Sequence, residues 1–268
     1  MALGAALLLA ACAPSRRGIE LADGAGSPFP SYAALWERVA APCRGVRTME
    51  FLLVLAGRSG DTTLRRTRMR AAAERAGSLR IEALAPFGAP LFVFAAHDEH
   101  ATLLLPRDRQ VVRDARPAEV LHALAGLALA PRDVHALLTG CLEPDPVAVA
   151  ARRHRDGSVA VELRGGATAY VRDPGDGQVV VAGRREDLTV EYAGHVRGLP
   201  RRLRIQVDGP RGGVDLDAEL SQVSMNIVLH PAAFTVDVPA RYVPVTLAGL
   251  RAPLEERALP PADVAARP

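Results

Sequence analysis

The sequence contains no lysine, and aromatic residues make up only 4% of its 268 residues. All 33 basic residues are therefore arginine, and they are scattered through segments with a strand-like pattern. A nucleic-acid-binding protein needs a clustered basic face, and one that stacks bases also needs aromatic side chains. The scattered arginines and the net charge of only +3 argue against a nucleic-acid partner.

The sequence also lacks the motifs of the common enzyme classes. It contains no Ser/His/Asp order, no paired carboxylates in helical register, no phosphate-binding glycine loop and no HExxH motif. The seven histidines are dispersed. Two of them are the first and last residues of the run His97-Asp98-Glu99-His100, whose two imidazoles and two carboxylates could suggest a metal site. Side chains diverge on a tight hairpin, however, and no further ligand follows at a metal-binding spacing. We therefore predict a solvated turn, no metal site, no cofactor and no catalysis.

No apolar run is long enough to be a stable transmembrane helix. Ala2–Ala11 spans ten residues, whereas about 20 are needed. The run has instead the length of a signal-peptide core. The tetrad Leu9-Ala10-Ala11-Cys12 matches the lipobox, in which small residues precede a cysteine that is acylated and becomes the mature N-terminus. It predicts a lipoprotein signal peptide over residues 1–11 and a lipid anchor on Cys12. The alternative is an ordinary cleaved secretory signal, since no arginine precedes the apolar core.

The composition divides the rest of the chain into three parts. Residues 12–30 are rich in Pro, Ser, Gly and Arg without periodicity, which predicts a flexible tether. Residues 31–251 suffice for one domain with a single core, and residues 252–268 form a Pro-rich tail. Several acyl chains give lasting attachment, so this domain would act at a membrane surface. Ala13 is not the Asp that retains enterobacterial lipoproteins at the inner membrane, which favours the periplasmic face of the outer membrane.

Two cysteines remain once Cys12 is assigned to lipid. Cys43 and Cys141 would lie in a compartment that permits disulfides, and each lies at the end of a helical segment. We predict that they form a disulfide, closing a loop of about 98 residues. Two buried free thiols are the alternative. Two cysteines this far apart do not make a zinc site.

Most of the remaining sequence has the period of β-strands. A first helix is predicted from Tyr32 to about Ala41, where Pro42 stops it, and two more over residues 117–124 and 131–139, each opened by a proline. In the first strand Met49, Phe51, Leu53 and Leu55 alternate up to a turn at residues 57–61. The other strands are predicted at residues 63–74, 78–84, 90–96, 101–105, 110–113, 147–153, 158–163, 168–172, 178–182, 188–192, 201–207 and 214–223.

These elements predict a mainly β protein of the α+β class. Short connections favour one antiparallel meander, preceded by a helix and interrupted midway by two more. A sheet this long must curl, close or be covered, because its apolar face cannot be left in water. The inner face would enclose either a cavity or a solid core.

Three segments carry a family resemblance. Leu79–Gly88 ends a strand in a Pro-apolar-Gly loop, and the strand Leu91–Phe94 follows. Gly126–Gly140 runs through Gly-apolar-x-apolar-x-Pro into a helix that ends in Gly, and Gly198–Leu203 has a Leu-Pro entry to a late strand. With the lipobox, these segments resemble the LolB family of outer-membrane lipoprotein receptors, within the LolA/LolB-like group. The resemblance implies a single curved antiparallel sheet that forms an incomplete β-barrel, with helices as a lid over a hydrophobic cavity.

The resemblance also implies a function without covalent chemistry. LolB-like proteins take lipoproteins from the periplasmic carrier LolA and insert them into the outer membrane. The implied partners are the membrane, the acyl chains of lipoproteins or lipid, and a LolA-like carrier. Acyl chains in water cost about 25 cal/mol per Å² of apolar surface, so such a protein needs an apolar pocket that binds and releases them.

The resemblance assigns roles to two groups of residues. Pro86, Phe87 and Gly88 fall where LolB exposes an apolar residue on a protruding loop that helps insertion into the membrane. The alternative for Phe87 is a core aromatic at a strand end. The acyl cavity is predicted to be lined by Phe51, Leu53, Leu79, Ile81, Phe92, Phe94, Leu103 and Leu105 from the strands and by Leu121, Leu124, Leu137 and Leu138 from the lid helices.

Two alternatives to this function stay open. A closed core without a ligand would leave the same pattern of apolar residues. A structural or adaptor lipoprotein of the cell envelope would use the same fold to hold a protein partner, again without catalysis.

Overall fold

A computed structural model describes residues 19, 21–22, 24–175, 177–209 and 213–250. The predicted signal peptide, Cys12 and the predicted tail over residues 252–268 lie outside this part of the chain.

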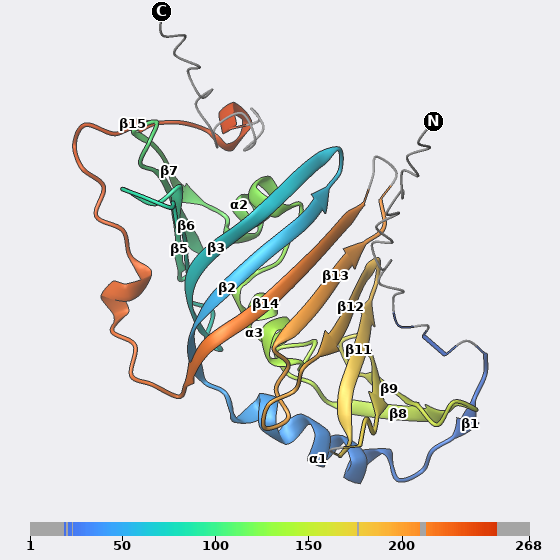
Figure 1. The fold of residues 1–268 in the computed structure, drawn as a ribbon. Helices are drawn as coiled ribbons and strands as arrows, with labels where there is room; N and C mark the ends of the chain where they lie inside the picture. Colours follow the sequence, from blue (N-terminus) through green and yellow to red (C-terminus); the bar gives the residue numbers. More distant parts are fainter. Residues whose placement is uncertain (1–18, 20, 23, 176, 210–212, 251–268) are drawn as a thin grey trace, which may run out of the picture.

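One sheet of 15 strands dominates the fold (Figure 1). In chain order its strands are β1 (Ser27–Pro28), β2 (Thr48–Ser59), β3 (Thr62–Glu74), β4 (Leu79–Ala83), β5 (Phe92–His97), β6 (His100–Leu105), β7 (Gln110–Ala115), β8 (Ala148–Arg153), β9 (Val159–Leu163), β10 (Thr168–Arg172), β11 (Val179–Arg185), β12 (Leu188–Ala193), β13 (Arg202–Val207), β14 (Val214–Met225) and β15 (Val243–Pro244).

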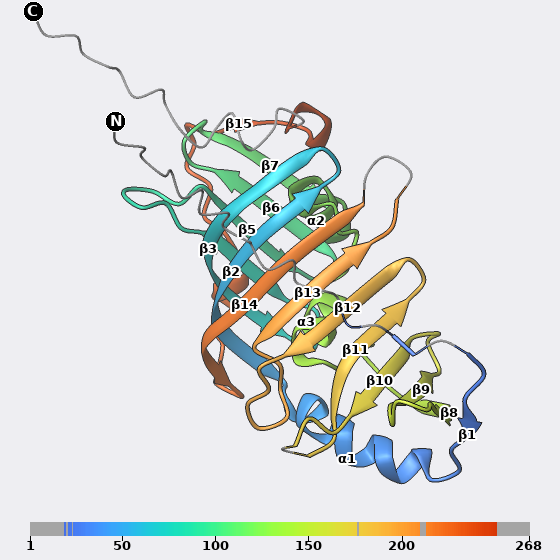
Figure 2. The same ribbon diagram turned by 45° about the vertical axis from the view of Figure 1, so that its right-hand side comes forward.

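The sheet consists of two meanders, β2 to β7 and β8 to β14, which join where β14 pairs with β2. All pairs are antiparallel except β15 with β7, which is parallel. The short edge strands β1 and β15 do not meet, so the curved sheet stays open (Figure 2). The predicted mainly β fold with an incomplete antiparallel barrel is therefore confirmed.

Three α-helices accompany the sheet in the described chain: α1 (Tyr32–Gly45), α2 (Pro117–Ala125) and α3 (Pro131–Thr139). Both views place α2 and α3 on the same, concave side of the sheet, while α1 lies across one end (Figures 1 and 2). Of these described helices, none is long and apolar enough to cross a bilayer. Single turns of 3-10 helix follow late in the chain, η1 (Pro231–Phe234) and η2 (Leu247–Leu250).

Both lid helices have the ends that their sequences predict. Each begins with a proline, whose missing N–H costs nothing in the first turn. Each is followed by a glycine in the left-handed conformation, Gly126 at φ 75° and Gly140 at φ 82°. Other residues adopt this conformation at a cost, which explains why both helices stop at a glycine.

The prediction that Pro42 ends the first helix is wrong. The helix α1 continues through Pro42 to Gly45, and the chain becomes extended at Val46. A proline removes one hydrogen bond from a helix, and here only one further turn depends on it. That turn is held by tertiary contacts instead, because Cys43 is bonded to another part of the chain and Pro42 lies against Gly198.

The packed core is one cluster that joins buried residues of the three α-helices to the inner face of the sheet. Trp36 of α1 is buried, and its indole N–H donates to the carbonyl of Pro146 at 2.7 Å. Phe51 of β2 and Phe94 of β5 are also fully buried and belong to the same cluster. Burying side chains of this size stabilises the fold by about 1.5–3 kcal/mol each.

The segment after α3 ties α1 to the second meander. Cys141 forms a disulfide with Cys43 of α1, with their Cα atoms 5.6 Å apart. The next residue, Leu142, packs tightly against Gly183 of β11, where a side chain on the glycine would collide with it. Glu143 is buried, and its carboxylate accepts hydrogen bonds from the backbone N–H groups of Gly165 and Ala167 at 3.2 and 2.8 Å. Nothing in the sequence motifs singled out Glu143.

The last residues of the predicted tether belong to the sheet. Ser27–Pro28 form β1, which pairs with Arg153 and Arg152 of β8. The Phe29 N–H donates to the carbonyl of Ala151 at 2.9 Å, and the Arg153 guanidinium lies 4.7 Å from the centre of the Phe29 ring. The predicted tether is therefore too long at its C-terminal end, because Ser27, Pro28 and Phe29 already pair with β8.

Residues 226–250, which we call the C-terminal strap, received no predicted element. Figure 1 shows the strap passing from the end of β14 around the outer side of β4 to β7. Its residues Val236, Val238 and Tyr242 pack against a second apolar cluster formed by Val93, Leu104 and Val111 on the outer face. The strap then forms β15 beside β7 and continues into η2, which contacts α2.

The disulfide leads to a test of stability. Replacing Cys43 and Cys141 by Ser should lower the free energy of unfolding by about 2–5 kcal/mol, because a cross-link between residues 98 apart restricts the unfolded chain. Urea denaturation of the oxidised protein and of the double variant measures the difference. Equal free energies of unfolding would show that the bond does not stabilise the fold.

A second test concerns His135, a buried residue of α3 whose Nε2 has no hydrogen-bond partner in the described structure. Burial, assisted by the charge of Arg75, lowers the pKa of His135 from 6.5 to about 4. The unfolded chain therefore binds a proton that the folded chain excludes, and stability should fall as the pH drops from about 6.5 to 4, by about 3 kcal/mol in full. Above pH 6.5 the effect vanishes.

His135→Leu should flatten this acid dependence, since leucine cannot take up a proton. Urea denaturation at pH 7.5 and pH 4.5 gives the two free energies for the wild type and for the variant. A variant that loses as much stability as the wild type between these pH values would contradict the assignment.

Candidate functional site

A cavity of about 390 Å³ lies between the inner face of the sheet and α2. Its walls come from β2, β3, β4, β5 and β6, and its roof comes from the apolar side of α2. Most of the lining is apolar, and the polar residues are Thr63, Arg65, Thr67, Arg107 and Asp108. The apolar lining residues are Leu53, Leu55, Leu64, Met69, Ile81, Leu91, Phe92, Leu105, Leu121, Leu124 and Ala125.

Six of the twelve predicted cavity residues line this cavity: Leu53, Ile81, Phe92, Leu105, Leu121 and Leu124. They sit toward the end of the sheet where β2, β4 and β6 finish and where β3 and β5 begin. The structure therefore brings together residues from four strands and one helix that lie up to 71 positions apart in the sequence.

The other six predicted cavity residues are packed in the core and do not line the cavity. They are Phe51, Leu79, Phe94, Leu103, Leu137 and Leu138. They were predicted because they share a strand face or a helix with the lining residues. Their side chains are enclosed by other buried residues of the main apolar cluster, to which α1 and α3 contribute.

The remaining apolar lining residues were missed by the sequence analysis. Leu55 and Met69 belong to the inner faces of β2 and β3, and Leu91 precedes β5. The alternation of Leu53 and Leu55 along β2 is a signal that could have added Leu55. Leu64 could not have been found in this way, because an irregularity in β3 changes the alternation near it.

The rim of the cavity carries charge. Arg65, Arg107 and Asp108 are exposed while they also line the cavity, as Thr63 does, which marks the side that opens to solvent. Arg65 comes from β3, and the other two charged residues come from the turn between β6 and β7. The site thus combines an apolar interior with polar groups at one edge.

The loop between β4 and β5 extends from the wall of this cavity. Ile81 and Phe92, on the strands that flank the loop, line the cavity, and the loop protrudes from the body of the protein in both views (Figures 1 and 2). Phe87 at its tip is 91% exposed, so it is not a core aromatic. Pro86 and Gly88 beside it are exposed as well, and Gly88 has φ 78°.

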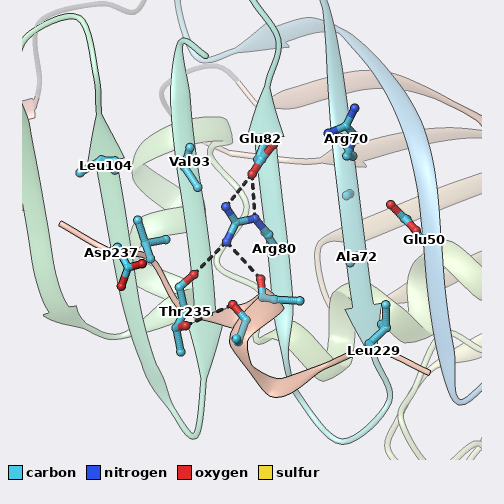
Figure 3. A pocket seen from close by; sticks show the side chains of 14 residues that line it. Glu50, Arg70, Ala72, Arg80, Glu82, Val93, Leu104, Leu229, Thr235 and Asp237 are labelled. Atoms are coloured by element: carbon cyan, nitrogen blue, oxygen red, sulfur yellow. Dashed lines mark hydrogen bonds and ion pairs between the residues drawn. The ribbon is translucent and has the colours of Figure 1, made fainter. Parts of the chain in front are cut away.

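A larger groove of about 740 Å³ lies on the opposite, outer face, under the C-terminal strap (Figure 3). Arg80 holds the strap by donating from Nη1 to the carbonyls of Ala233 and Thr235 at 3.1 and 2.9 Å. Its Nε and Nη2 both donate to Glu82 at 2.8 and 2.6 Å. Arg70, Glu50 and Asp237 also line this groove, and so many charges make it a poor site for an acyl chain.

The run His97-Asp98-Glu99-His100 forms the turn between β5 and β6. Asp98 and Glu99 have positive φ angles of 47° and 68°, and all four residues are exposed. The Nδ1 atom of His97 lies 2.9 Å from the hydroxyl of Ser78. No group of three or more His, Cys, Asp and Glu residues in the described chain has a metal-binding arrangement.

No protein-family model and no curated protein matches the sequence. Among solved structures, the chain is similar to a DUF1329 family protein from Desulfovibrio piger, with 12% identity, a TM-score of 0.48, and 78% of this chain and 98% of that chain covered. A LolA superfamily protein from Nitrosomonas europaea gives 10% identity and a TM-score of 0.47 over 75% of this chain and 97% of that one. The lipoprotein LppX of Mycobacterium tuberculosis is 13% identical, with a TM-score of 0.31, and the match covers 78% of this chain and 99% of that one. Likeness of this degree assigns neither a family nor a function to the chain.

Proposed function

We propose that this protein is a membrane-anchored lipoprotein that binds acyl chains in its apolar cavity and helps to receive lipoproteins and insert them into the outer membrane. The single observation that carries the proposal is the cavity beneath α2, which is apolar inside and polar at one edge. A ligand with a hydrocarbon chain and a polar head matches this distribution.

The size of the cavity supports this choice of ligand. Its volume of about 390 Å³ lies toward the lower end of the range of about 300–1,000 Å³ that small-molecule sites occupy. Burying an acyl chain in the cavity is favourable by about 25 cal/mol per Å² of apolar surface removed from water. A cavity that is open on one side covers the chain only in part, which keeps binding reversible.

The exposed loop supports a role at a membrane. Phe87 leaves a large apolar side chain in water at the tip of a protruding loop, next to the cavity wall. Moving the phenyl ring from water into the acyl chains of a bilayer would be favourable, because its apolar surface would be removed from water. Pro86, Phe87 and Gly88 would thus place the cavity against the bilayer, while acylated Cys12 keeps the protein at the periplasmic face of the outer membrane. A LolA-like periplasmic carrier would be the donor of the cargo.

An adaptor lipoprotein is the second candidate, and the outer groove favours it. The groove is larger than the cavity and lined by charged residues, as a site for a polar protein segment would be. This function would not need the cavity to be empty. Filling the cavity therefore separates the two candidates.

The variant Leu53→Trp should bind a fluorescent fatty acid at least tenfold more weakly than the wild type, because the indole would occupy the space that the chain needs. Leu52→Trp is the matched control, since Leu52 is the neighbouring residue on β2, points to the outer face and does not line the cavity. Fluorescence titration measures both affinities. Unchanged binding to a correctly folded Leu53→Trp protein would remove the cavity from the proposed function.

Phe87→Glu should slow the transfer of a lipoprotein to outer-membrane vesicles about tenfold while leaving the melting temperature unchanged, because an exposed side chain contributes little to stability. Phe87→Leu keeps an apolar tip and should retain most of the activity. Transfer is measured by sedimenting the vesicles and quantifying the lipoprotein that they carry. If Phe87→Glu transfers as fast as Phe87→Leu, the loop has no role in insertion.

A further inference from the structure

The strand β3 contains a β-bulge at the edge of the cavity. Leu55 of β2 pairs with Thr67 of β3, whereas Gly57 pairs with Leu64, so the single residue Ala56 faces both Arg65 and Arg66. An extra residue of this kind bends a strand and changes the direction of the side chains around it.

The bulge depends on the backbone of the neighbouring strands. Gly57 has φ 144°, which other residues rarely adopt, and a side chain there would collide with the carbonyl oxygen of Asp215 on β14. The hydroxyl of Thr67 donates to the carbonyl of Arg65 at 2.8 Å and holds the bulged residue from within β3. The irregularity is therefore a fixed feature of this part of the sheet.

Two consecutive arginines of β3, Arg65 and Arg66, lie on opposite faces of the sheet. Arg66 points to the outer face, where its Nη2 lies 3.4 Å from a carboxylate oxygen of Glu219 on β14. Arg65 lines the cavity, as its neighbour Leu64 does. Arg65 continues the alternation of Met69 and Thr67, which also line the cavity, so its side of the strand follows from the period of two. The extra residue of the bulge brings Leu64 to this same face, next to the guanidinium of Arg65.

A second guanidinium lies on the same rim. Arg107, from the turn between β6 and β7, lines the cavity together with Asp108. The charged groups on the rim are therefore two guanidinium groups and one carboxylate, and they leave a net positive charge at the mouth of a cavity that is otherwise apolar. A guanidinium presents several N–H donors in one plane, which match the oxygens of a carboxylate or a phosphate.

We infer that the cavity selects single-chain amphiphiles with an anionic head group, such as a fatty acid or an alkyl phosphate, with Arg65 and Arg107 binding the head while the chain fills the apolar interior. The inference rests on the proposed binding of acyl chains in this cavity, and it does not depend on the transfer of lipoproteins. Arg65 is the residue that sets the preference, because it follows the cavity-lining residues Met69 and Thr67 on the inner face of β3 and stands at the rim.

The test compares two probes that differ in the head group, decyl phosphate and decanol, both below the concentration at which they aggregate. Isothermal titration calorimetry gives their affinities for the wild type and for the variants Arg65→Gln and Arg66→Gln. The two variants remove the same charge from adjacent positions on opposite faces of β3, and Arg66→Gln is therefore the matched control.

The wild type should bind decyl phosphate about three- to tenfold more tightly than decanol, as a charge-assisted hydrogen bond at a partly exposed site predicts. Arg65→Gln should lose most of this preference and retain its affinity for decanol, whereas Arg66→Gln should behave like the wild type. Added salt should weaken the binding of decyl phosphate alone, because ions screen only the charged probe.

Three results would overturn the inference. Equal affinities for the two probes would show that the rim does not select a charge, and equal effects of the two variants would show that only net charge matters. Inorganic phosphate that binds as tightly as decyl phosphate would make the rim an anion site independent of the cavity. The proposed function has a different signature of failure, because then neither amphiphile would bind to a protein with an unchanged melting temperature.

Discussion

The inner face of the large curved sheet must be kept from water, and only three short helices in the described chain are there to cover it. Much of this face is packed in one core with residues of α1 and α3, and Trp36, Phe51 and Phe94 are buried there. Beneath α2 the packing is incomplete, and a cavity remains. A single sheet thereby supplies both a stable core and a space that a ligand can fill, because its length exceeds the reach of its helices.

The two ends of the sheet differ in how firmly they are held. Around the packed end, the bond between Cys43 and Cys141 and the buried carboxylate of Glu143 tie α1, α3 and the turn between β9 and β10 to one another. The cavity end depends on α2, on the strap that reaches α2 through η2, and on the bulge in β3. A ligand that enters beneath α2 would therefore contact the part of the fold that neither the disulfide nor the carboxylate of Glu143 holds.

The sequence allowed the fold to be predicted where local chemistry determines the structure. The alternation along β2 from Met49 to Leu55 and the proline and glycine at the ends of α2 and α3 act over a few residues, and the structure has these elements at the predicted places. The strap has no such signal, because its residues are held by distant groups such as the guanidinium of Arg80. Pro42 misled the prediction for the same reason, since contacts from Cys141 and Gly198 hold the last turn of α1.

The candidate site could be predicted only in part. Alternation identifies the face of the sheet on which Phe92 and Phe94 lie, but it does not tell that Phe92 borders free volume while Phe94 is enclosed. That difference depends on where the helices end in three dimensions. Arg65 was missed for another reason, because a charged residue on the inner face of a strand does not fit the apolar pattern by which cavity residues were chosen, although it keeps the alternation of Met69 and Thr67.

Both edges of the open sheet are two-residue strands that end in a proline, Pro28 in β1 and Pro244 in β15. A proline has no backbone N–H to offer to another strand, and so short a strand presents little else to pair with. Open sheets ordinarily invite neighbouring molecules to add strands and grow into aggregates. Here the sheet can stay open without growing, because each edge ends in a residue at which further pairing stops.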